Sequence, residues 1–222
     1  SKKLRADKEV VMAAVKNNGR QLQYASDELR ADKEVVLAAV KNTGHALPYA
    51  SEELRKELST NREEVLSAVT LDGEALMDFD DAFRSDKEVV LAAVTNDESY
   101  SGEVFKSIDK KLQADKEVIL AAVKNDQSCL EYVSEELVDK EVILTALEGG
   151  DWVEDTYFYI FPNVGDNAPC WKDKDLNWQL IKEANGLTTL GLRVIKRSHP
   201  SLWTDKAFVI AMLENLYAVA EE

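Results

Sequence analysis

A nine-residue phrase that recurs along the chain constrains the fold more than any other feature. It reads DKEVVLAAV at Asp32 and Asp86, DKEVVMAAV at Asp7, DKEVILAAV at Asp115 and DKEVILTAL at Asp139. A catalytic site does not need five copies of itself, whereas an array of repeats does. The phrase therefore predicts a chain built from one repeated structural unit.

Less regular copies extend this array. Asn61 begins the looser copy NREEVLSAV, and degenerate copies begin at Asp173 and Asp205. The sequence therefore predicts three regions, which are six helical-hairpin repeats over residues 1–147 with starts near 7, 32, 61, 86, 115 and 139, an aromatic insertion over 148–172, and two degenerate repeats with a C-terminal cap over 173–222.

The first half of each unit is expected to be a helix. Asp7 is a favourable N-cap, and Glu9 in the first turn suits the positive end of the helix dipole. The apolar run Val10–Val15 does not alternate with polar residues, so it is not a half-exposed strand. Its valines favour strands, but its alanines and the Lys-Asn that follows indicate a helix. Asn17-Asn18-Gly19 follows, and Gly or Asn there is expected to end the helix by adopting left-handed geometry.

The second half of the unit has the pattern of a shorter helix. Leu22, Ala25, Ser26 and Leu29 follow the spacing i, i+3, i+4, i+7 that marks one helix face. Isolated helices below ~12–15 residues are marginal, so such hairpins must stack on their neighbours. The predicted fold is all-α, a right-handed-type α-solenoid of short helical hairpins with an aromatic-rich insertion before the last two degenerate repeats.

The cleanest copy of the full phrase, Asp32 to Arg55, reads DKEVVLAAVKNTGHALPYASEELR. It resembles a multi-copy helical repeat family of unknown function that occurs in algae, protists and intracellular bacteria. The resemblance covers roughly residues 7 to 147. It implies a helical repeat module, and because the family brings no established catalytic residues, it implies none in this chain.

The charge balance narrows the class of partner. The chain has 27 basic and 42 acidic residues and a net charge of −15, which argues against nucleic acid and against anionic membrane surfaces. A protein partner, in particular a basic one, or solubility alone, fits this charge better. No apolar run approaches the ~20 residues that span a bilayer, so we expect no direct membrane insertion.

Few residues suggest chemistry. His45 is expected to be exposed at the start of a second helix, His199 lies in a predicted loop, and the two are not at metal-ligand spacing. Cys129 is expected to point outward, and neither it nor Cys170 has a basic neighbour that would activate a thiolate. We therefore predict no catalytic residue, no cofactor and no metal. Two cysteines do not form a disulfide framework, so a reducing intracellular compartment, cytoplasm or organelle, is expected.

Two features suggest surfaces for a partner. The insertion is rich in residues that are enriched at binding hot spots, and its candidate partner surface consists of Trp152, Tyr157, Tyr159, Phe161 and Trp171. The alternative is that the insertion caps the array or joins two stacks and buries these rings. The repeated Asp-Lys-Glu could likewise form an acidic track, or only complement each helix dipole.

The favoured hypothesis is a non-enzymatic protein–protein interaction scaffold, because stacked repeats offer an extended surface. The alternative is a targeting or accessory module of a larger protein, a secreted effector included. An enzyme with a site in the aromatic insertion is the third hypothesis. The oligomeric state is left open by the sequence.

Overall fold

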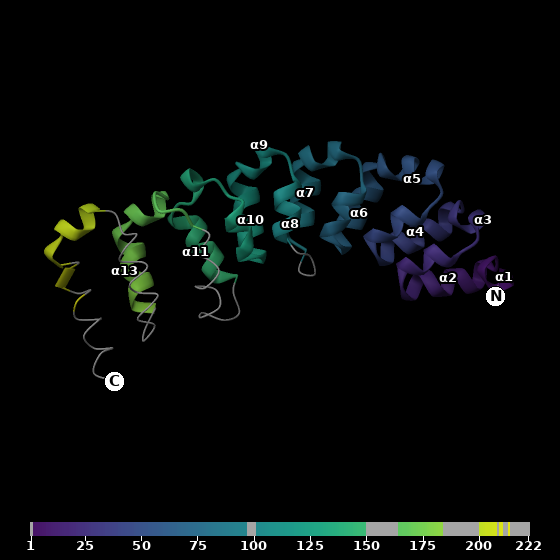
Figure 1. Cartoon of the computed structure of the whole chain (residues 1–222), viewed down its shortest axis with the longest axis horizontal. Helices are drawn as coiled ribbons and strands as arrows, with labels where there is room; N and C mark the ends of the chain where they lie inside the picture. The colour runs from purple at the N-terminus through teal and green to yellow at the C-terminus, as the bar shows by residue number, and fades with distance from the viewer. Residues whose placement is uncertain are drawn as a thin grey trace, which may run out of the picture.

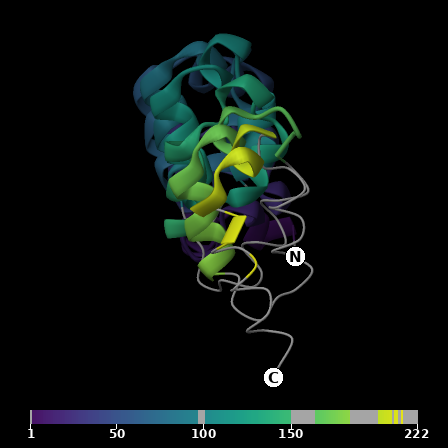
Figure 2. The same ribbon diagram turned by 90° about the vertical axis from the view of Figure 1, so that its left-hand side faces the viewer.

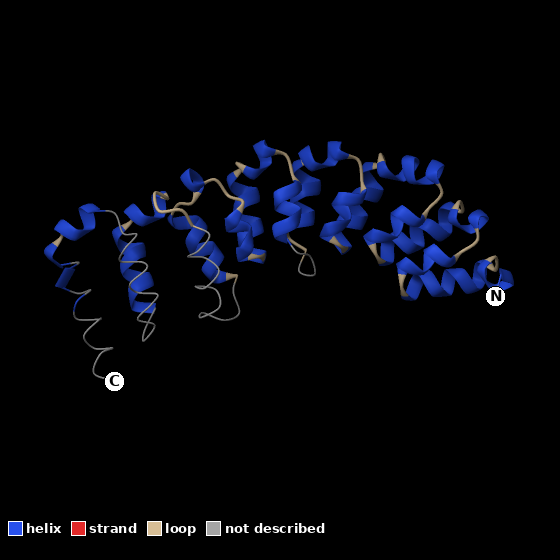
Figure 3. Cartoon of the chain, viewed as in Figure 1, coloured by secondary structure: helices blue, strands red, loops and turns tan. Residues whose placement is uncertain are grey.

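The computed structural model describes residues 2–96, 101–149, 164–183, 200–207, 209, 210 and 213. Within these residues every regular element is a helix and no strand occurs (Figure 3), so the all-α prediction is confirmed. The helices follow one another in chain order along an elongated array, from α1 (Lys2–Arg5) at one end to α13 (Lys174–Glu183) and η8 (Pro200–Thr204) at the other (Figure 1). Viewed from the η8 end, successive helices overlap, as expected of units that stack in sequence (Figure 2).

We refer to the segments that begin at residues 7, 32, 61, 86, 115 and 139 as the first to sixth repeats. Each begins with an α-helix, called here its first helix. These are α2 (Lys8–Asn17), α4 (Lys33–Asn42), α6 (Arg62–Leu71), α7 (Lys87–Val94), α10 (Lys116–Asn125) and α11 (Lys140–Glu148).

Shorter helices complete each of the first five repeats. The helix that follows the first helix is a 3₁₀ helix in four of these repeats and an α-helix in the fourth repeat. In chain order, these helices are η1 (Gly19–Tyr24), η2 (Gly44–Tyr49), η3 (Gly73–Asp78), α8 (Ser101–Ser107) and η5 (Gln127–Glu131). A last short helix follows, and these are α3 (Asp27–Arg30), α5 (Glu52–Ser59), η4 (Asp81–Ser85), α9 (Lys110–Gln113) and η6 (Glu135–Leu137). In the later part of the chain, η7 (Pro169–Lys172) precedes α13.

The first helices begin where their capping residues stand. The Asp32 carboxylate accepts hydrogen bonds from the backbone amides of Glu34 and Val35, which have no partner inside the helix. Asp7, Asn61, Asp86 and Asp115 cap their helices in the same way. Each such cap contributes about 1 kcal/mol, and the first residue of the phrase thus defines where each repeat starts.

The predicted second helix is wrong in one respect, because the structure divides it. Residues 19–30 form η1, then two extended residues, Ala25 and Ser26, and then α3. The Ser26 amide donates to the Arg5 carbonyl of the preceding segment at 2.8 Å, rather than to a carbonyl within a helix. Ser51 donates in the same way to Arg30. A backbone bond to the neighbouring unit therefore interrupts the helix that side-chain spacing predicted.

The predicted role of Gly19 is also wrong. The residue before it, Asn18, is extended (φ −153°, ψ 111°), and Gly19 begins η1 with a φ outside the left-handed region. A Cβ on Gly19 would lie 2.2 Å from the carbonyl oxygen of Ala39 in the next repeat, and a Cβ on Gly44 would lie 2.0 Å from Ala75 Cβ. Glycine is present because successive repeats approach closely here, and not because the backbone needs a positive φ.

The core is continuous along the array. In α4 the buried arc is Val35, Val36, Ala39 and Val40, and Leu47 of η2 packs into the same core. The corresponding residues of α7 and α10 are all buried too, whereas Val10 of α2, the first helix of the first repeat, is 42% exposed. Full burial of a Val or Leu side chain contributes about 1.5–3 kcal/mol, and much of each arc is covered by the next repeat. Helices of this length are therefore held by their neighbours.

Candidate functional site

In most repeats the basic residue after the cap joins its repeat to the next one, and Lys33 of the second repeat, which pairs with Glu57 of its own repeat, is the exception. Lys8 Nζ lies 2.7 Å from Asp32 Oδ2 and 2.8 Å from Glu34 Oε2. The equivalent pairs are Arg62–Asp86, Lys87–Asp115, Lys116–Asp139, Lys140–Asp173 and Lys174–Asp205. Each of these aspartates has two roles. It stands at the start of its own helix, and it pairs with the basic residue of the segment before it. We call this series the ion-pair ladder.

The ladder changes the charge that the acidic first turns present. The hydrogen bond from Lys8 lowers the pKa of the Asp32 carboxyl below its ordinary value, and Asp32 and Glu34 in turn raise the pKa of Lys8. Lys87 likewise lowers the pKa of Asp115. The glutamates of the ladder stay largely exposed, with 73% of the Glu34 side chain accessible. Along the ion-pair ladder, paired aspartates and basic side chains therefore alternate, and the glutamates beside them remain exposed.

A second link lies at the other end of the first helices. Asn42 Nδ2 donates to the Lys16 carbonyl at 3.0 Å, and Asn42 Oδ1 accepts from the Gly19 amide at 2.7 Å. Asn96 and Asn125 stand at the same helix position and donate to carbonyls of the preceding repeats. This asparagine link satisfies backbone groups at a helix end, where no intrahelical partner exists.

The side of the first helices that faces away from the valine arc forms the outer face of the array. It carries a row of half-buried apolar side chains, one per repeat, which are Met12, Leu37, Leu66, Leu91, Leu120 and Leu144. A row of exposed glutamates runs beside it, which are Glu9, Glu34, Glu63, Glu88, Glu117 and Glu141. On α6 a shallow hollow of about 420 Å³ opens on this face and is lined by Glu63, Leu66, Ser67, Thr70 and Leu71.

The environment of His45 differs from the prediction, because the ring is partly buried and only 24% of it is exposed. Its Nδ1 lies 2.8 Å from Asp78 Oδ2, and its Nε2 lies 3.2 Å from Glu74 Oε2 and 3.9 Å from Asp72 Oδ2. Burial alone lowers the pKa of His45, but the hydrogen bonds to Asp78 and Glu74 and the charge of Asp72 outweigh it and raise the pKa. In the described part of the chain, no cluster has an arrangement suited to a metal ion.

The cysteines are less accessible than predicted. Cys129 was expected to point outward, but its side chain is fully buried, and so is that of Cys170. Burial raises the pKa of the Cys129 thiol, and the nearby Asp126 carboxylate raises it further. The thiolate is therefore disfavoured, which makes this position unsuited to a nucleophile.

The aromatic candidate partner surface is described at one residue. Trp171 is 2% exposed and its indole nitrogen donates to the Gly165 carbonyl at 2.7 Å, so its ring is part of the core and offers no face to a partner. The other four residues, Trp152, Tyr157, Tyr159 and Phe161, lie outside the described residues, as does His199. For those four positions the partner surface stays a prediction.

The outer face was missed by sequence reasoning, although its signal is in the phrase. A helical wheel places Met12 beside the apolar valines, so the wheel alone does not separate this row from the buried arc. The sign of a separate row was that each repeat has Leu or Met at this position, while the small residue after it varies among Ala, Ser and Thr. The recurring Lys after the capping Asp was the sequence signal for the ion-pair ladder. The carboxylate that pairs with this Lys lies in another repeat, so the sequence alone did not identify it.

No helix in the described parts of the chain combines the length and apolar character needed to cross a membrane.

Comparison with known proteins identifies the family of this chain. Searches of curated proteins and of solved structures found no match to this chain. A family model, the domain of unknown function DUF4116, matches residues 7–55, 61–113, 99–138 and 115–159. These matches cover more than half of the chain and recur along it, as the repeated helices do, and the chain belongs to the DUF4116 family.

Proposed function

We propose that the chain is a non-enzymatic protein–protein interaction scaffold that binds a basic protein segment along its outer face. The scaffold in this proposal is a right-handed-type α-solenoid with an aromatic-rich insertion before its last two repeats. The observation that carries the proposal is the row of half-buried apolar side chains from Met12 to Leu144, which lies beside the row of glutamates.

The apolar row is not explained by the core alone. In α7 the buried arc of Val89, Val90, Ala93 and Val94 is fully covered, while Leu91 keeps part of its surface in water. One such leucine on a surface is ordinary, but a row that continues over six neighbouring helices forms a stripe. A stripe of this kind, bordered by charged residues, is typical of a surface that another protein covers.

The spacing of the apolar row and the charge of the glutamates indicate which kind of segment would fit the outer face. Neighbouring helices pack ~8–10 Å apart, so the apolar side chains of the row follow one another at about that interval. A segment in the polyproline II conformation rises ~3.1 Å per residue with three residues per turn, so every third side chain points the same way and falls ~9 Å from the last. A segment with an apolar residue at every third position would match the row, and basic residues between them would meet the glutamates.

Synthetic peptides test this proposal directly. The first peptide has leucine at every third position and lysine between, and the second has glutamate in place of lysine. We expect the lysine peptide to bind in a fluorescence anisotropy titration and the glutamate peptide not to bind. Leu91→Ser together with Leu120→Ser should weaken binding by about tenfold or more, because two apolar contacts are lost.

A matched control separates the outer face from apolar surface in general. Leu4 is 52% exposed on α1, away from the row, so Leu4→Ser removes an exposed leucine without touching the outer face. Its affinity for the peptide should equal that of the unchanged protein. Equal binding of both peptides, or the same loss in Leu4→Ser as in the double variant, would contradict the proposal. Circular dichroism of each variant checks that the helices are retained.

A further inference from the structure

The junction between the second and third repeats, called here the second junction, lacks both links found at the first junction, between the first and second repeats. The capping residue of α6 is the neutral Asn61, and Lys33 pairs within its own repeat, with Glu57 Oε1 at 2.6 Å. At the other end of the helix, Leu71 occupies the position at which Asn42 bonds the first repeat. The ion-pair ladder and the asparagine link are therefore both interrupted at one junction.

The second junction differs from the first in the exposure of Leu71 and in the length of one backbone hydrogen bond. Leu71 is 47% exposed and lines the hollow on α6, at the helix position where the asparagine link closes the first junction. The backbone bond across the second junction, from the Asp80 amide to the Ser59 carbonyl, is 3.3 Å long. The equivalent bond across the first junction, from Ser51 to Arg30, is 2.8 Å long.

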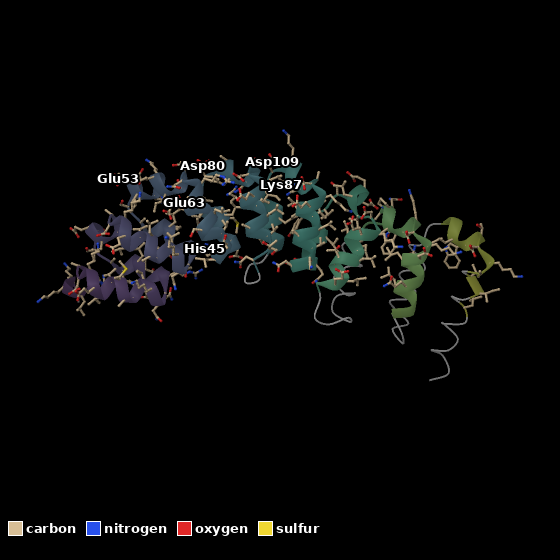
Figure 4. The ribbon with its side chains drawn as sticks, turned by 180° about the vertical axis from the view of Figure 1, so that it is seen from behind. His45, Glu53, Glu63, Asp80, Lys87 and Asp109 are labelled. Atoms are coloured by element: carbon tan, nitrogen blue, oxygen red, sulfur yellow. The ribbon has the colours of Figure 1, made fainter. Side chains whose placement is uncertain are left out.

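His45 provides the polar link that remains on the lower side of this junction. It belongs to η2 of the second repeat, whereas its partners Asp78, Glu74 and Asp72 belong to the third. Figure 4 places His45 low on the ribbon, far from Glu53 and Asp80 at the upper edge. Both ring nitrogens lie at carboxylate oxygens, and only the doubly protonated imidazolium can donate a hydrogen bond to both.

The other charged groups near η2 do not replace these carboxylates. The elements packed against η2 are η1, α4, α6 and η3. Asp72, Glu74 and Asp78 of the η3 segment are the titratable residues of these elements that lie within ion-pair distance of the His45 ring. The other titratable residues of these elements lie farther away, and they are Arg20 and Tyr24 on η1, Lys33, Glu34 and Lys41 on α4, and Arg62, Glu63 and Glu64 on α6. Tyr49 lies on η2 itself. The link therefore depends on the charge of one histidine.

We propose that the second junction is a pH-responsive hinge, closed while the His45 ring is charged and released when the ring loses its proton. Neutral imidazole has one N–H, so it can donate to Asp78 or to Glu74 and leaves the other carboxylate facing a lone pair. The repeats on either side keep their own cores, and the array bends at this junction. The first junction contains no histidine link and stays closed over the same range.

The direction of the pH effect follows from the raised pKa of His45. A group whose pKa is higher in the folded protein than in the unfolded chain stabilises the fold fully below its unfolded value. This contribution is lost as the pH rises through the folded value. The hinge is therefore closed at pH values below the ordinary histidine pKa and opens at pH values above the raised pKa of His45.

Hydrogen exchange at two equivalent backbone amides measures the opening. The Asp80 amide spans the second junction and the Ser51 amide spans the first, so each reports on its own junction. After correction for base-catalysed exchange, protection of Asp80 should fall about three- to tenfold between these pH values, as expected for loss of a partly buried charged hydrogen bond. Protection of Ser51 should stay constant.

Two variants separate the charge from the shape of the ring. His45→Arg keeps a permanent cation, of the kind that Arg20 supplies at the same position of the first repeat, and should make Asp80 protection independent of pH. His45→Gln should leave the junction open at every pH. Circular dichroism confirms that each variant keeps its helices, and exchange at Ser51 reports whether the first junction is intact.

Three results would overturn the hinge. One is unchanged Asp80 protection in the native protein across the range. Another is a pH effect of equal size at Ser51 and Asp80, which would mean global loosening. The third is a pH response in His45→Arg that matches the native protein. None of these readouts involves a partner, so the hinge stands or falls independently of the proposed scaffold function.

Discussion

The first and second junctions use the same repeat phrase and reach different solutions. At the first junction, Lys8 joins Asp32, and Asn42 joins Lys16 and Gly19. At the second, Asn61 and Leu71 occupy the corresponding positions, and His45 takes part in a different set of contacts. The comparison shows that the valine and alanine core defines how the units stack, whereas a few polar residues decide how firmly each pair is held.

The largest effect is expected from filling the glycine contact at the first junction. Gly19→Ala places a Cβ 2.2 Å from the Ala39 carbonyl oxygen, so the two repeats must move apart. We expect a loss of about 3 kcal/mol of unfolding free energy, measured by urea denaturation. Gly44→Ala creates a similar clash at the second junction, with Ala75 Cβ at 2.0 Å. If the second junction yields more easily, Gly44→Ala costs less, and an equal cost would remove that difference.

The next effect is expected from breaking the asparagine link. Asn42→Leu copies at the first junction the residue that Leu71 supplies at the second. The substitution removes the bonds to the Lys16 carbonyl and the Gly19 amide, and should cost about 1–3 kcal/mol because backbone groups lose their partners. Faster exchange of the Ser51 amide would place the damage at the first junction. Unchanged exchange there would show that the link is dispensable.

The reverse substitution should strengthen the second junction. Leu71→Asn restores the residue that bonds the preceding repeat and removes an exposed leucine. We expect a gain of about 0.5–1.5 kcal/mol, with slower exchange at Asp80. Leu71→Ser is the control, because it removes the leucine without providing the amide. If both variants gain equally, the benefit comes from losing exposed apolar surface and not from the link.

A smaller and more local effect is expected at the histidine. Asp78→Asn removes the charge nearest to Nδ1 and should lower the pKa of His45, because the hydrogen bond to Asp78 is the largest influence that raises it. The ring proton resonances of His45 in an NMR titration report this pKa. No change at His45 would mean that Glu74 and Asp72 alone hold the proton.

The smallest effect is expected from repairing the ion-pair ladder. Asn61→Asp gives Lys33 the capping carboxylate that its counterparts meet in other repeats, but Lys33 already pairs with Glu57. Exposed ion pairs contribute little and are screened by salt. We expect a slight rise in the midpoint of thermal unfolding at low ionic strength and none at high salt. A large rise would show that Glu57 is a poor substitute for the capping residue.

Much of the helical pattern could be predicted locally, because its causes are local. A capping side chain bonds amides two and three residues away, so Asp7 and its counterparts reveal the helix starts without any tertiary knowledge. The division of residues 19–30 could not be predicted, because the Ser26 amide bonds a carbonyl of the preceding segment. The burial of Cys129 was missed for the same reason, since the groups that cover it come from elsewhere in the chain.

The sequence by itself determined that the chain is an all-α repeat protein, because composition, period and caps act over a few residues. Only the tertiary structure decided that Gly19 serves a close approach, that Lys8 pairs with Asp32 of the next repeat, and that His45 meets three carboxylates of another repeat. Each of these contacts joins residues about 20 to 35 positions apart, and the distance between such residues depends on how the units stack.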